Sequence, residues 1–230
     1  METTSAKWIV ISLGGSLIYP KEQDVEYVQR FVDLIKSKLT SHDFAVITGG
    51  GFLARKMQEE LRTAHADVTT KELDNVGIVA TRANAVYVRN VFGDVAEADI
   101  FLDPTNLALS GKPVLVGGGW KPGHSSDGAA VGLAKTLGAK RVINLSNIDY
   151  VYTADPRTNP DAEKIEKSNW TDFRKLLPEE WYPGSSAPFD PVAAQMAEEL
   201  GLEVVIMNGK NLENLENYID GKEFLGTVIS

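Results

Sequence analysis

The sequence predicts an α/β protein whose helices cover both faces of a mainly parallel β-sheet. Short apolar runs of the kind that form buried strands alternate with segments whose apolar residues recur at helical spacing. Glycine-rich turns follow three of these runs, with the sequences GGS at 14–16, GGG at 49–51 and GGGWKPGHSSD at 117–127. A chain of 230 residues, 43% of them hydrophobic, suits one such domain or two small lobes that share a sheet.

The first half of the chain shows the alternation in order. The run WIVISL is apolar apart from Ser12, as is typical of a buried strand, and Val28, Val32 and Ile35 then recur on one helical face. The expected elements are a strand at 8–13, a helix at 25–39, a strand at 44–48, a helix at 54–64, one long helix or two joined helices at 71–92, and short strands at 99–102 and 113–116.

The second half continues the pattern after one interruption. Residues 146–167 are rich in Asn, Asp and Pro, which indicates turns or a hairpin at the surface. Asp190, Pro191 and Gly201 have the positions of an N-cap, a first helical residue and a C-cap. The expected elements are helices at 128–138, 171–177, 189–201 and 212–220, and strands at 141–145, 202–209 and 225–230.

Composition excludes several classes of protein. The formal net charge is −9 and no run of Lys or Arg occurs, so we expect no nucleic-acid binding. The absence of cysteine excludes disulfides, thiolate nucleophiles and cysteine metal sites, and three scattered histidines do not predict a metal site either. No stretch approaches the ~20 apolar residues that cross a bilayer, and the start METTSAKW is unlike a signal peptide, so we expect a cytoplasmic protein with no membrane contact.

The glycine turns have two interpretations. A single Gly pair most often marks a tight turn that needs positive φ. Three such turns, all at the carboxyl ends of predicted parallel strands, favour a set of cradles in which backbone N–H groups bind phosphates. The P-loop motif is absent, and the glycines at 117–123 do not match the dinucleotide fingerprint. Separate turns that each hold a phosphate-sized anion favour a site of phosphoryl transfer.

Two helical segments carry candidate polar residues. Arg55 lies one turn after GGG, where a guanidinium reaches phosphate oxygens, although it can also pair with Glu59 at i+4. Asp74 lies in a mostly apolar segment and suits two vicinal hydroxyls, although an exposed or capping role is the simpler interpretation. Arg82 and Asn84 in the same segment are either structural or at a subunit contact.

The third glycine turn leads into a polar loop. His124 is either a hydrogen-bonded loop residue or part of a ligand site. Ser125 and Ser126 offer hydroxyls to a ligand or to the start of the next helix. We expect Asp127 to be the N-cap, which leaves the serines for a ligand.

Two residues in the hairpin segment have plain structural interpretations. Asp149 suits an Asx-turn, and Tyr152 suits packing in a hairpin. Tyr152 also offers a flat face for a purine.

Several motifs occur in the order seen in a known family. They are SLGGSLI at 12–18, VITGGGFLARK at 46–56, LDNVGIVATRANA at 73–85, GGGWKPGHSSDGAA at 117–130 and LSNIDYVYTADPRTNPDA at 145–162, followed by GTVI at 226–229. The chain thereby resembles the amino-acid-kinase superfamily over nearly its whole length, and within it the uridylate (UMP) kinases of archaeal type. The blocks PGHSSDGAA and NIDYVYTADPR are the specific ones.

The resemblance implies a fold and a reaction. The family has a three-layer αβα sandwich around a largely parallel sheet, and here it would form one domain over residues 1–230. About 1–125 would bind the acceptor and about 126–230 would bind ATP. The implied enzyme is an ATP-dependent UMP kinase of pyrimidine biosynthesis, which converts ATP and UMP to ADP and UDP with Mg²⁺. The family is typically a homohexamer built from dimers.

The resemblance also implies roles for individual residues. Arg55 would lie over the phosphates, and the acidic position of Asp149 would help to organise the transfer site, so both are catalytic candidates. Asp74 would accept hydrogen bonds from the ribose hydroxyls of UMP. The donor nucleotide would contact Gly15, Ser16, Gly51, Arg55, Ser146, Asn147, Tyr152 and Asp155. The acceptor would contact Gly50, Asp74, Trp120, Lys121, Pro122, Gly123, His124, Ser125 and Ser126.

The chain departs from the family at a few positions. Many members have Lys where Ser12 stands, and that Lys stabilises charge on the transferred phosphoryl group. Lys7 is expected at the far end of the strand, which leaves Lys121 as a candidate substitute. Trp120 replaces a smaller residue, and Tyr150 replaces a glycine near the donor. The alternatives are another small-molecule kinase of this superfamily, with a carboxylate, carbamate or isoprenoid-phosphate acceptor, and a non-catalytic nucleotide-binding or storage protein on the same fold.

Overall fold

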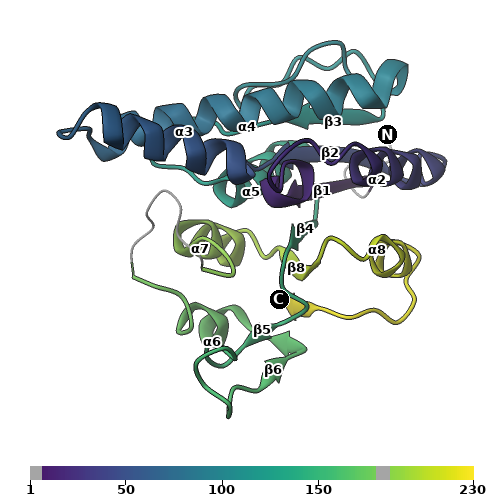
Figure 1. The fold of residues 1–230 in the computed structure, drawn as a ribbon. Helices are drawn as coiled ribbons and strands as arrows, with labels where there is room; N and C mark the ends of the chain where they lie inside the picture. The colour runs from purple at the N-terminus through teal and green to yellow at the C-terminus, as the bar shows by residue number, and fades with distance from the viewer. Residues whose placement is uncertain (1–6, 180–186) are drawn as a thin grey trace.

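The computed structural model describes residues 7–179 and 187–230. In them a seven-stranded sheet with the strand order β3-β2-β1-β4-β8-β9-β7 is covered by helices on both faces, as Figure 1 shows. The expected α/β sandwich is confirmed. The elements are β1 (Trp8–Leu13), α1 (Gly15–Ile18), α2 (Val25–Ser37), β2 (Asp43–Thr48), α3 (Gly51–Ala64), α4 (Thr70–Phe92), η2 (Gly93–Val95), β3 (Val114–Gly117), α5 (Ser126–Leu137), β4 (Arg141–Ser146), β5 (Val151–Tyr152), β6 (Lys164–Ile165), β7 (Lys167–Ser168), α6 (Trp170–Arg174), α7 (Pro191–Glu199), β8 (Glu203–Asn208), α8 (Leu212–Ile219) and β9 (Thr227–Ile229).

The sheet is parallel at every pairing of named strands except one. β1 pairs with β2 and β4, β2 with β3, and β4 with β8, all in parallel, whereas β9 runs antiparallel to β8. The carboxyl ends of β1, β2 and β3 therefore meet at one edge, and each is followed by one of the three glycine turns. Lys7 pairs with Asp43 at 2.9 Å, which places it at the opposite end of β1 as expected.

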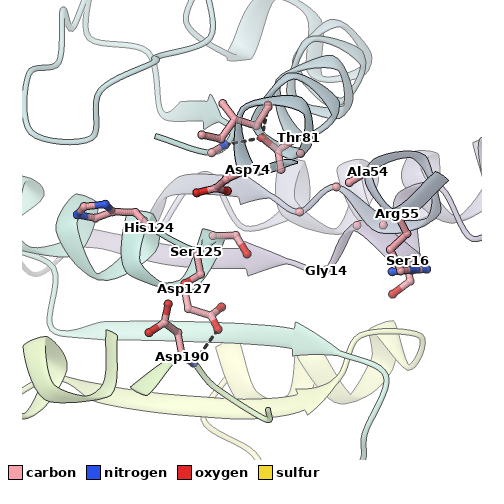
Figure 2. Close-up of a pocket in the computed structure, with 18 of the residues that line it drawn as sticks. Gly14, Ser16, Ala54, Arg55, Asp74, Thr81, His124, Ser125, Asp127 and Asp190 are labelled. Carbon is pink, nitrogen blue, oxygen red and sulfur yellow. Dashed lines mark hydrogen bonds between the residues drawn. The ribbon is translucent and has the colours of Figure 1, made fainter. Parts of the chain in front are cut away.

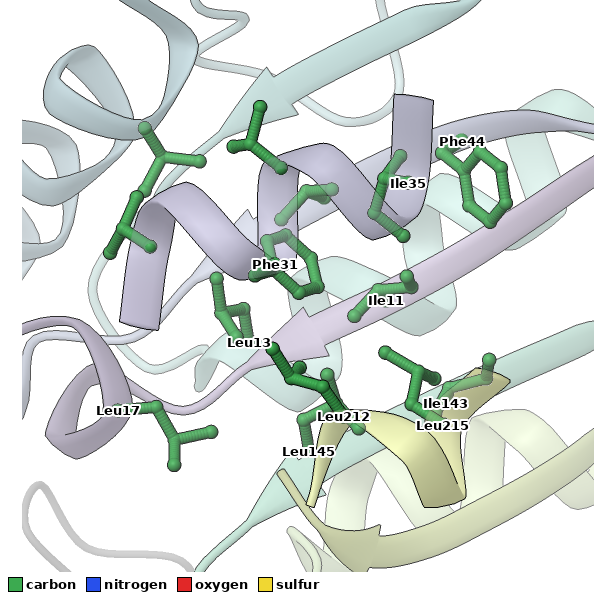
Figure 3. Packing of buried hydrophobic residues seen from close by; sticks show 14 of the residues in the cluster. Ile11, Leu13, Leu17, Phe31, Ile35, Phe44, Ile143, Leu145, Leu212 and Leu215 are labelled. Carbon is green, nitrogen blue, oxygen red and sulfur yellow. The ribbon is translucent and has the colours of Figure 1, made fainter. Parts of the chain in front are cut away.

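Alternation along β1 distributes its side chains between two cores. Ile9, Ile11 and Leu13 belong to the cluster formed with α2, α4 and α8, part of which Figure 3 shows. Val10 belongs to the other cluster, which is formed with α5, α6 and α7. Ser12 has the same parity as Val10 and therefore faces α5.

Helix α2 illustrates how local sequence and packing agree. Asp24 is its N-cap, because its Oδ1 accepts a hydrogen bond of 3.0 Å from the N–H of Tyr27. The apolar stripe then buries Phe31 completely, and the ring of Phe31 meets Phe92 of α4 edge-to-face at 6.3 Å between centroids. The helix thereby joins the sheet to α4.

Helix α4 is continuous from Thr70 to Phe92. The segment predicted as one long helix or two joined helices is therefore one helix. Its start is a capping box, in which the N–H of Glu72 bonds to the Thr69 hydroxyl and Glu72 accepts from the N–H of Thr69.

None of the helices within residues 7–179 and 187–230 has the length and apolar character needed to span a bilayer.

Several boundary predictions were wrong, among them the helices expected at 25–39 and 171–177, which end at Ser37 and Arg174. Residues 99–102 form no strand, because only isolated bridges at Ala96 and Phe101 reach β3. Helix α3 begins at Gly51 rather than at 54, since the glycine turn itself provides the first helical turn. Gly201 follows the C-cap Leu200 of α7, with a φ of 58°. Ser125, not Asp127, caps α5, by accepting the N–H of Gly128 at 3.1 Å; Asp127 lies within the helix.

Truncation of Phe31 tests the packing of α2 against the sheet. We predict that Phe31→Ala lowers the free energy of unfolding by about 3–5 kcal/mol, because it removes a fully buried ring from the junction with α4. Val25→Ala is the matched control on the same helix, since Val25 is 63% exposed and its truncation is expected to change stability by less than about 0.5 kcal/mol. Urea denaturation measures both, and equal effects would contradict the account.

Candidate active site

A pocket of about 320 Å³ opens at the edge of the sheet where β1, β2 and β3 end. Its wall is built from the three glycine turns, one side of α4 and the start of α5. Figure 2 shows Arg55 and Ser16 toward one end of the pocket and His124 toward the other, with Asp74 above Ser125. The lining residues are Gly14, Gly15, Ser16, Gly49, Gly50, Gly51, Ala54, Arg55, Gln58, Asp74, Gly77, Ile78, Thr81, Gly119, His124, Ser125, Ser126, Asp127, Ala187 and Asp190.

The first and second glycine turns pack directly on each other. A Cβ atom on Gly15 would lie 2.1 Å from the N of Gly51, and one on Gly51 would lie 2.2 Å from the O of Gly15. These distances exclude any side chain at either position. Gly51 also has a φ of 61°, as a tight turn requires. Close backbone approach is thus a third reason for these glycines, besides positive φ and anion binding.

The second turn leads into α3 with unused backbone donors. The N–H groups of Gly50 and Gly51 precede the first intrahelical bonds, and neither donates a hydrogen bond to a residue in 7–179 or 187–230. Arg55 follows one turn later, is exposed and lines the pocket. Its alternative partner Glu59 forms no ion pair with it in this part of the chain, and the neighbouring pair is Lys56 with Glu60 at 3.9 Å.

The third glycine turn is fastened to α4. The Thr81 hydroxyl accepts the N–H of Gly119 at 2.6 Å. Arg82 donates to the carbonyl oxygens of Gly119 at 3.2 Å and Trp120 at 2.7 Å. Arg82 therefore has the structural role that its sequence position left open, because its guanidinium holds the entry to the loop.

Asp74 holds the same loop further along. Its Oδ2 accepts a 2.6 Å hydrogen bond from the N–H of Gly123, a residue whose φ of 84° favours glycine. The side chain is buried, and burial raises the pKa of its carboxyl group, while the Gly123 N–H and His124 oppose the rise. Asp74 is thus neither exposed nor a cap, and its Oδ1 has no hydrogen-bond partner among the described residues.

The remaining side chains of the loop stack on one another. The Lys121 ammonium lies 4.0 Å from the centroid of the Trp120 ring. The rings of His124 and Trp120 meet edge-to-face, with 4.7 Å between their centroids. His124 lines the pocket, whereas Trp120, Lys121, Pro122 and Gly123 are outside the lining set. In this arrangement the Lys121 ammonium group lies over the Trp120 ring, and Lys121 does not line the pocket.

The buried Ser12 and the half-buried Asp127 form a polar group on the α5 side of β1. The Ser12 hydroxyl and the Asn144 amide each donate to Asp127 Oδ1 at 3.1 Å, and the N–H of Asp190 donates to Oδ2 at 3.3 Å. Ser12 and Asn144 are neighbours in the register of β1 and β4, which explains why both reach one carboxylate. Figure 2 shows Asp127 and Asp190 facing each other. Burial, with a smaller contribution from the charge of Asp190, raises the pKa of Asp127 to about 7.

The residues expected at the donor nucleotide divide into two groups. The pocket is lined by Gly15, Ser16, Gly51 and Arg55, whereas the other four, Ser146, Asn147, Tyr152 and Asp155, lie outside it. Ser146 ends β4 and Tyr152 lies in β5, a strand that pairs only with β6 in the described sheet (Figure 1). The exposed Asn147 and Asp149 lie between them, and Asp149 accepts a 2.9 Å hydrogen bond from the Asn208 amide. Asp155 pairs with Arg157 at 2.8 Å, an interaction that lowers the pKa of its carboxyl group.

Sequence reasoning missed one feature of the pocket wall. Asp74, Gly77, Thr81 and Asn84 recur at intervals of three and four residues, so they share the face of α4 that meets the glycine turns. Asn84 donates its amide to the carbonyl oxygens of Gly49 at 2.8 Å and Gly50 at 3.4 Å. Polar and glycine residues on one face of an apolar helix were the available signal.

The chain is similar in sequence and fold to known proteins. A Pyrococcus abyssi protein named uridylate kinase is 33% identical over 223 residues, which covers 96% of this chain and 98% of the relative. Another protein of that name, from Methanobrevibacter smithii, is 33% identical over 226 residues, with 96% and 99% covered. The crystal structure of uridylate kinase from Archaeoglobus fulgidus superposes with a TM-score of 0.83 at 29% identity, covering 96% of this chain and 99% of that one.

A more distant structure shares the fold alone. UMP kinase from Bacillus anthracis superposes with a TM-score of 0.78 at 19% identity.

Residues 7–208 match the amino acid kinase family, a span that includes the pocket-lining residues. The chain therefore belongs to the amino acid kinase family.

Proposed function

We propose that this protein is an ATP-dependent UMP kinase, which transfers the γ-phosphoryl group of ATP to UMP. The observation that carries the proposal is the arrangement of the pocket, where two facing glycine turns and Arg55 lie toward one end and Asp74 lies toward the other. The first end suits phosphates, and the second suits ribose hydroxyls. The relatives named uridylate kinase support this choice of acceptor.

The proposed reaction is a direct in-line transfer. A phosphate oxygen of UMP attacks the γ-phosphorus of ATP, the bond from that phosphorus to the β,γ-bridging oxygen breaks, and its electron pair leaves with ADP. The products are ADP and UDP, and total charge is conserved. A nucleoside monophosphate has its second pKa near ~6, so it is already a dianion at neutral pH and no general base is required. The protein contributes position and charge neutralisation.

Backbone donors carry much of that neutralisation in our account. Arg55 is the only Lys or Arg among the described residues that line the pocket, against three carboxylates, Asp74, Asp127 and Asp190. Ser12 contributes no charge, because it is neutral and bonded to Asp127. The N–H groups of Gly50 and Gly51 are unpaired within the described residues and stand at the start of α3, where the helix dipole favours anions.

Magnesium fits this chemistry as an ion that arrives on ATP. The described residues contain no cluster of three or more metal-ligating side chains, and the carboxylate of Asp127 is engaged by three donors. Mg²⁺ commonly binds through substrate phosphates while it keeps several waters. When bound, it would neutralise phosphate charge; the ligands would come from the nucleotide rather than from a protein cage.

The remaining assignments are proposals of the same kind. Ser16, Ser146, Asn147, Tyr152 and Asp155 would contact the donor nucleotide, and Asp149 would help to organise the transfer site. The sheet order supports the division near residue 125, because the three strands before it lie together at one side of the sheet. From the resemblance alone, we infer a homohexamer in pyrimidine biosynthesis. From the sequence composition, we infer a cytoplasmic location.

An assay of ADP release tests the function. We expect turnover with ATP, Mg²⁺ and UMP, and slower turnover with CMP. Turnover only with an acceptor of another class would favour a different kinase of the family. ATP binding without turnover on any acceptor would favour the non-catalytic alternative. The reason to test that alternative is that Ser12 stands where many members of the family have a lysine.

Arg55→Ala tests the proposed phosphate end of the pocket. We predict that kcat falls by about 10- to 100-fold, because a charged hydrogen bond to the transferred group is lost. Lys56→Ala is the control, since Lys56 is adjacent and pairs with Glu60. Steady-state kinetics measure both, and an Arg55→Ala enzyme with the kcat of the control would remove Arg55 from the catalytic set.

Asp74→Ala tests the proposed ribose end. We predict that KM for UMP rises by about tenfold or more, while kcat changes less, because the carboxylate would bind parts of UMP that do not react. Asp74→Asn keeps an oxygen that can accept the N–H of Gly123, so it separates loss of the loop contact from loss of charge. Unchanged KM values in both variants would contradict the assignment.

Asp127→Asn tests the unusual carboxylate in the pocket wall. The pKa of Asp127 is about 7 in the folded protein and 3.8 by its ordinary value, so between these pH values only the folded state keeps the proton. Its contribution to stability therefore falls as pH rises from 4 to 7. Between pH 5.5 and 8 we predict that wild type loses about 1–2 kcal/mol more than Asp127→Asn in urea denaturation. Parallel pH profiles would contradict the burial of an ionisable group here.

A further inference from the structure

Three consecutive glycines form the second turn, and their peptide groups need an external anchor. Glycine has the widest choice of backbone conformation, so the planes of the Gly49–Gly50 and Gly50–Gly51 peptides are poorly determined by local sequence. A phosphate cradle works only if its N–H groups are aimed before the ligand arrives. The structure therefore has to fix these planes from outside the turn.

Asn84 of α4 contacts both peptides. Its Nδ2 donates to Gly49 O at 2.8 Å and to Gly50 O at 3.4 Å, and its side chain has no exposed surface. Both acceptors are carbonyl oxygens, so the orientation of the amide follows from chemistry. Asn84 lies on the same face of the 23-residue helix α4 as Asp74 and Thr81, which hold the third glycine turn and its loop.

Peptide geometry links these contacts to the pocket. In a trans peptide the C=O and N–H bonds point in opposite directions, and every peptide in the described chain is trans. By binding the oxygen of Gly49, Asn84 determines where the N–H group of Gly50 points. The oxygen of Gly50 also accepts the N–H of Ala54 at 3.3 Å, so Asn84 and the first turn of α3 together determine where the N–H group of Gly51 points. Both glycines line the pocket, and neither N–H has an acceptor in the described residues.

The cost of Asn84 argues against a purely structural role. Its Oδ1 is buried and has no hydrogen-bond partner in the described part of the chain, and an unsatisfied buried acceptor destabilises a fold. Asn214 of α8 is a buried asparagine with both groups satisfied, because Nδ2 donates to Leu225 O and Oδ1 accepts from Leu225 N, each at 2.7 Å. A residue selected for folding alone resembles Asn214 rather than Asn84.

We propose that Asn84 is a positioning residue for phosphoryl transfer, which fixes the peptide planes of the second glycine turn and so aims the N–H groups of Gly50 and Gly51 at the transferred phosphate. The inference rests on the proposed function for its kinetic consequence. It names no contact between Asn84 and substrate; the side chain acts through the glycine backbone. Loss of the anchor leaves the glycines in place and lets their peptides rotate.

Kinetics of Asn84→Ala test the proposal, with Asn214→Ala as the matched control. We expect kcat of Asn84→Ala to fall about tenfold or more, with KM for ATP and UMP within threefold of wild type. Asn214→Ala is expected to lose stability but to keep kcat within twofold. Equal kcat in wild type and Asn84→Ala, or an equal loss of kcat in Asn214→Ala, would overturn the proposal.

Asn84→Asp adds a readout that a structural role would not affect. The carboxylate has the shape of the amide but lacks the donor, and protonation restores an O–H that can donate. The kcat of Asn84→Asp relative to wild type is therefore expected to rise as pH falls. A ratio that does not change with pH would contradict the donor role. Failure of both variants to fold would show that Asn84 serves folding, and would also overturn the proposal.

Amide NMR separates this inference from the proposed function. With tripolyphosphate as the probe, the Gly50 and Gly51 amide signals of wild type are expected to shift, and those of Asn84→Ala to shift at least threefold less. If wild type shows these shifts and Asn84→Ala shows the smaller ones, but wild type does not turn over UMP, the proposed function fails and the anchoring role stands. If wild type turns over UMP and both proteins shift equally, the anchoring role fails.

Discussion

Two backbone segments touch where the first and second glycine turns meet, and the site depends on that contact. No Cβ fits at Gly15 or Gly51, because each would overlap the backbone of the other turn. The N–H of Gly14 also donates to Leu145 O at 2.9 Å, which ties the first turn to β4. These two contacts hold the carboxyl ends of β1, β2 and β4 in fixed relative positions, so the pocket has a rigid floor.

Helix α4 supplies the second constraint, because it holds the remaining parts of the wall. One face of it binds the second turn through Asn84, the third turn through Thr81 and the loop after the third turn through Asp74. The pocket is consequently organised by neutral backbone groups more than by charge, with Arg55 as the cation that lines it in the described structure. This arrangement explains how a chain with Ser12 in place of the usual lysine can still suit phosphates: Ser12 instead supports Asp127.

Most of the fold could be predicted because the strands are apolar runs and the helices have clear spacing. The strand at 8–13 and the helix after Asp190 and Pro191 followed from local sequence alone. Residues 99–102 were mistaken for a strand, since a short apolar run looks the same whether it pairs fully or through one bridge. Asp127 was mistaken for a cap because its partners Ser12 and Asn144 come from strands far away in sequence. Asn84 had no local signal of its partners, which only the packing of α4 on the glycine turns reveals.

A crystal structure with UMP and a non-hydrolysable ATP analogue tests the central claim most directly, namely that the facing glycine turns hold the two reacting phosphates. The account predicts that the UMP phosphate and the γ-phosphate analogue meet in the pocket beside the contact of Gly15 with Gly51, within hydrogen-bond distance of the Gly50 or Gly51 N–H, with the ribose of UMP on Asp74. Phosphates bound elsewhere, with no contact to these amides, would contradict it.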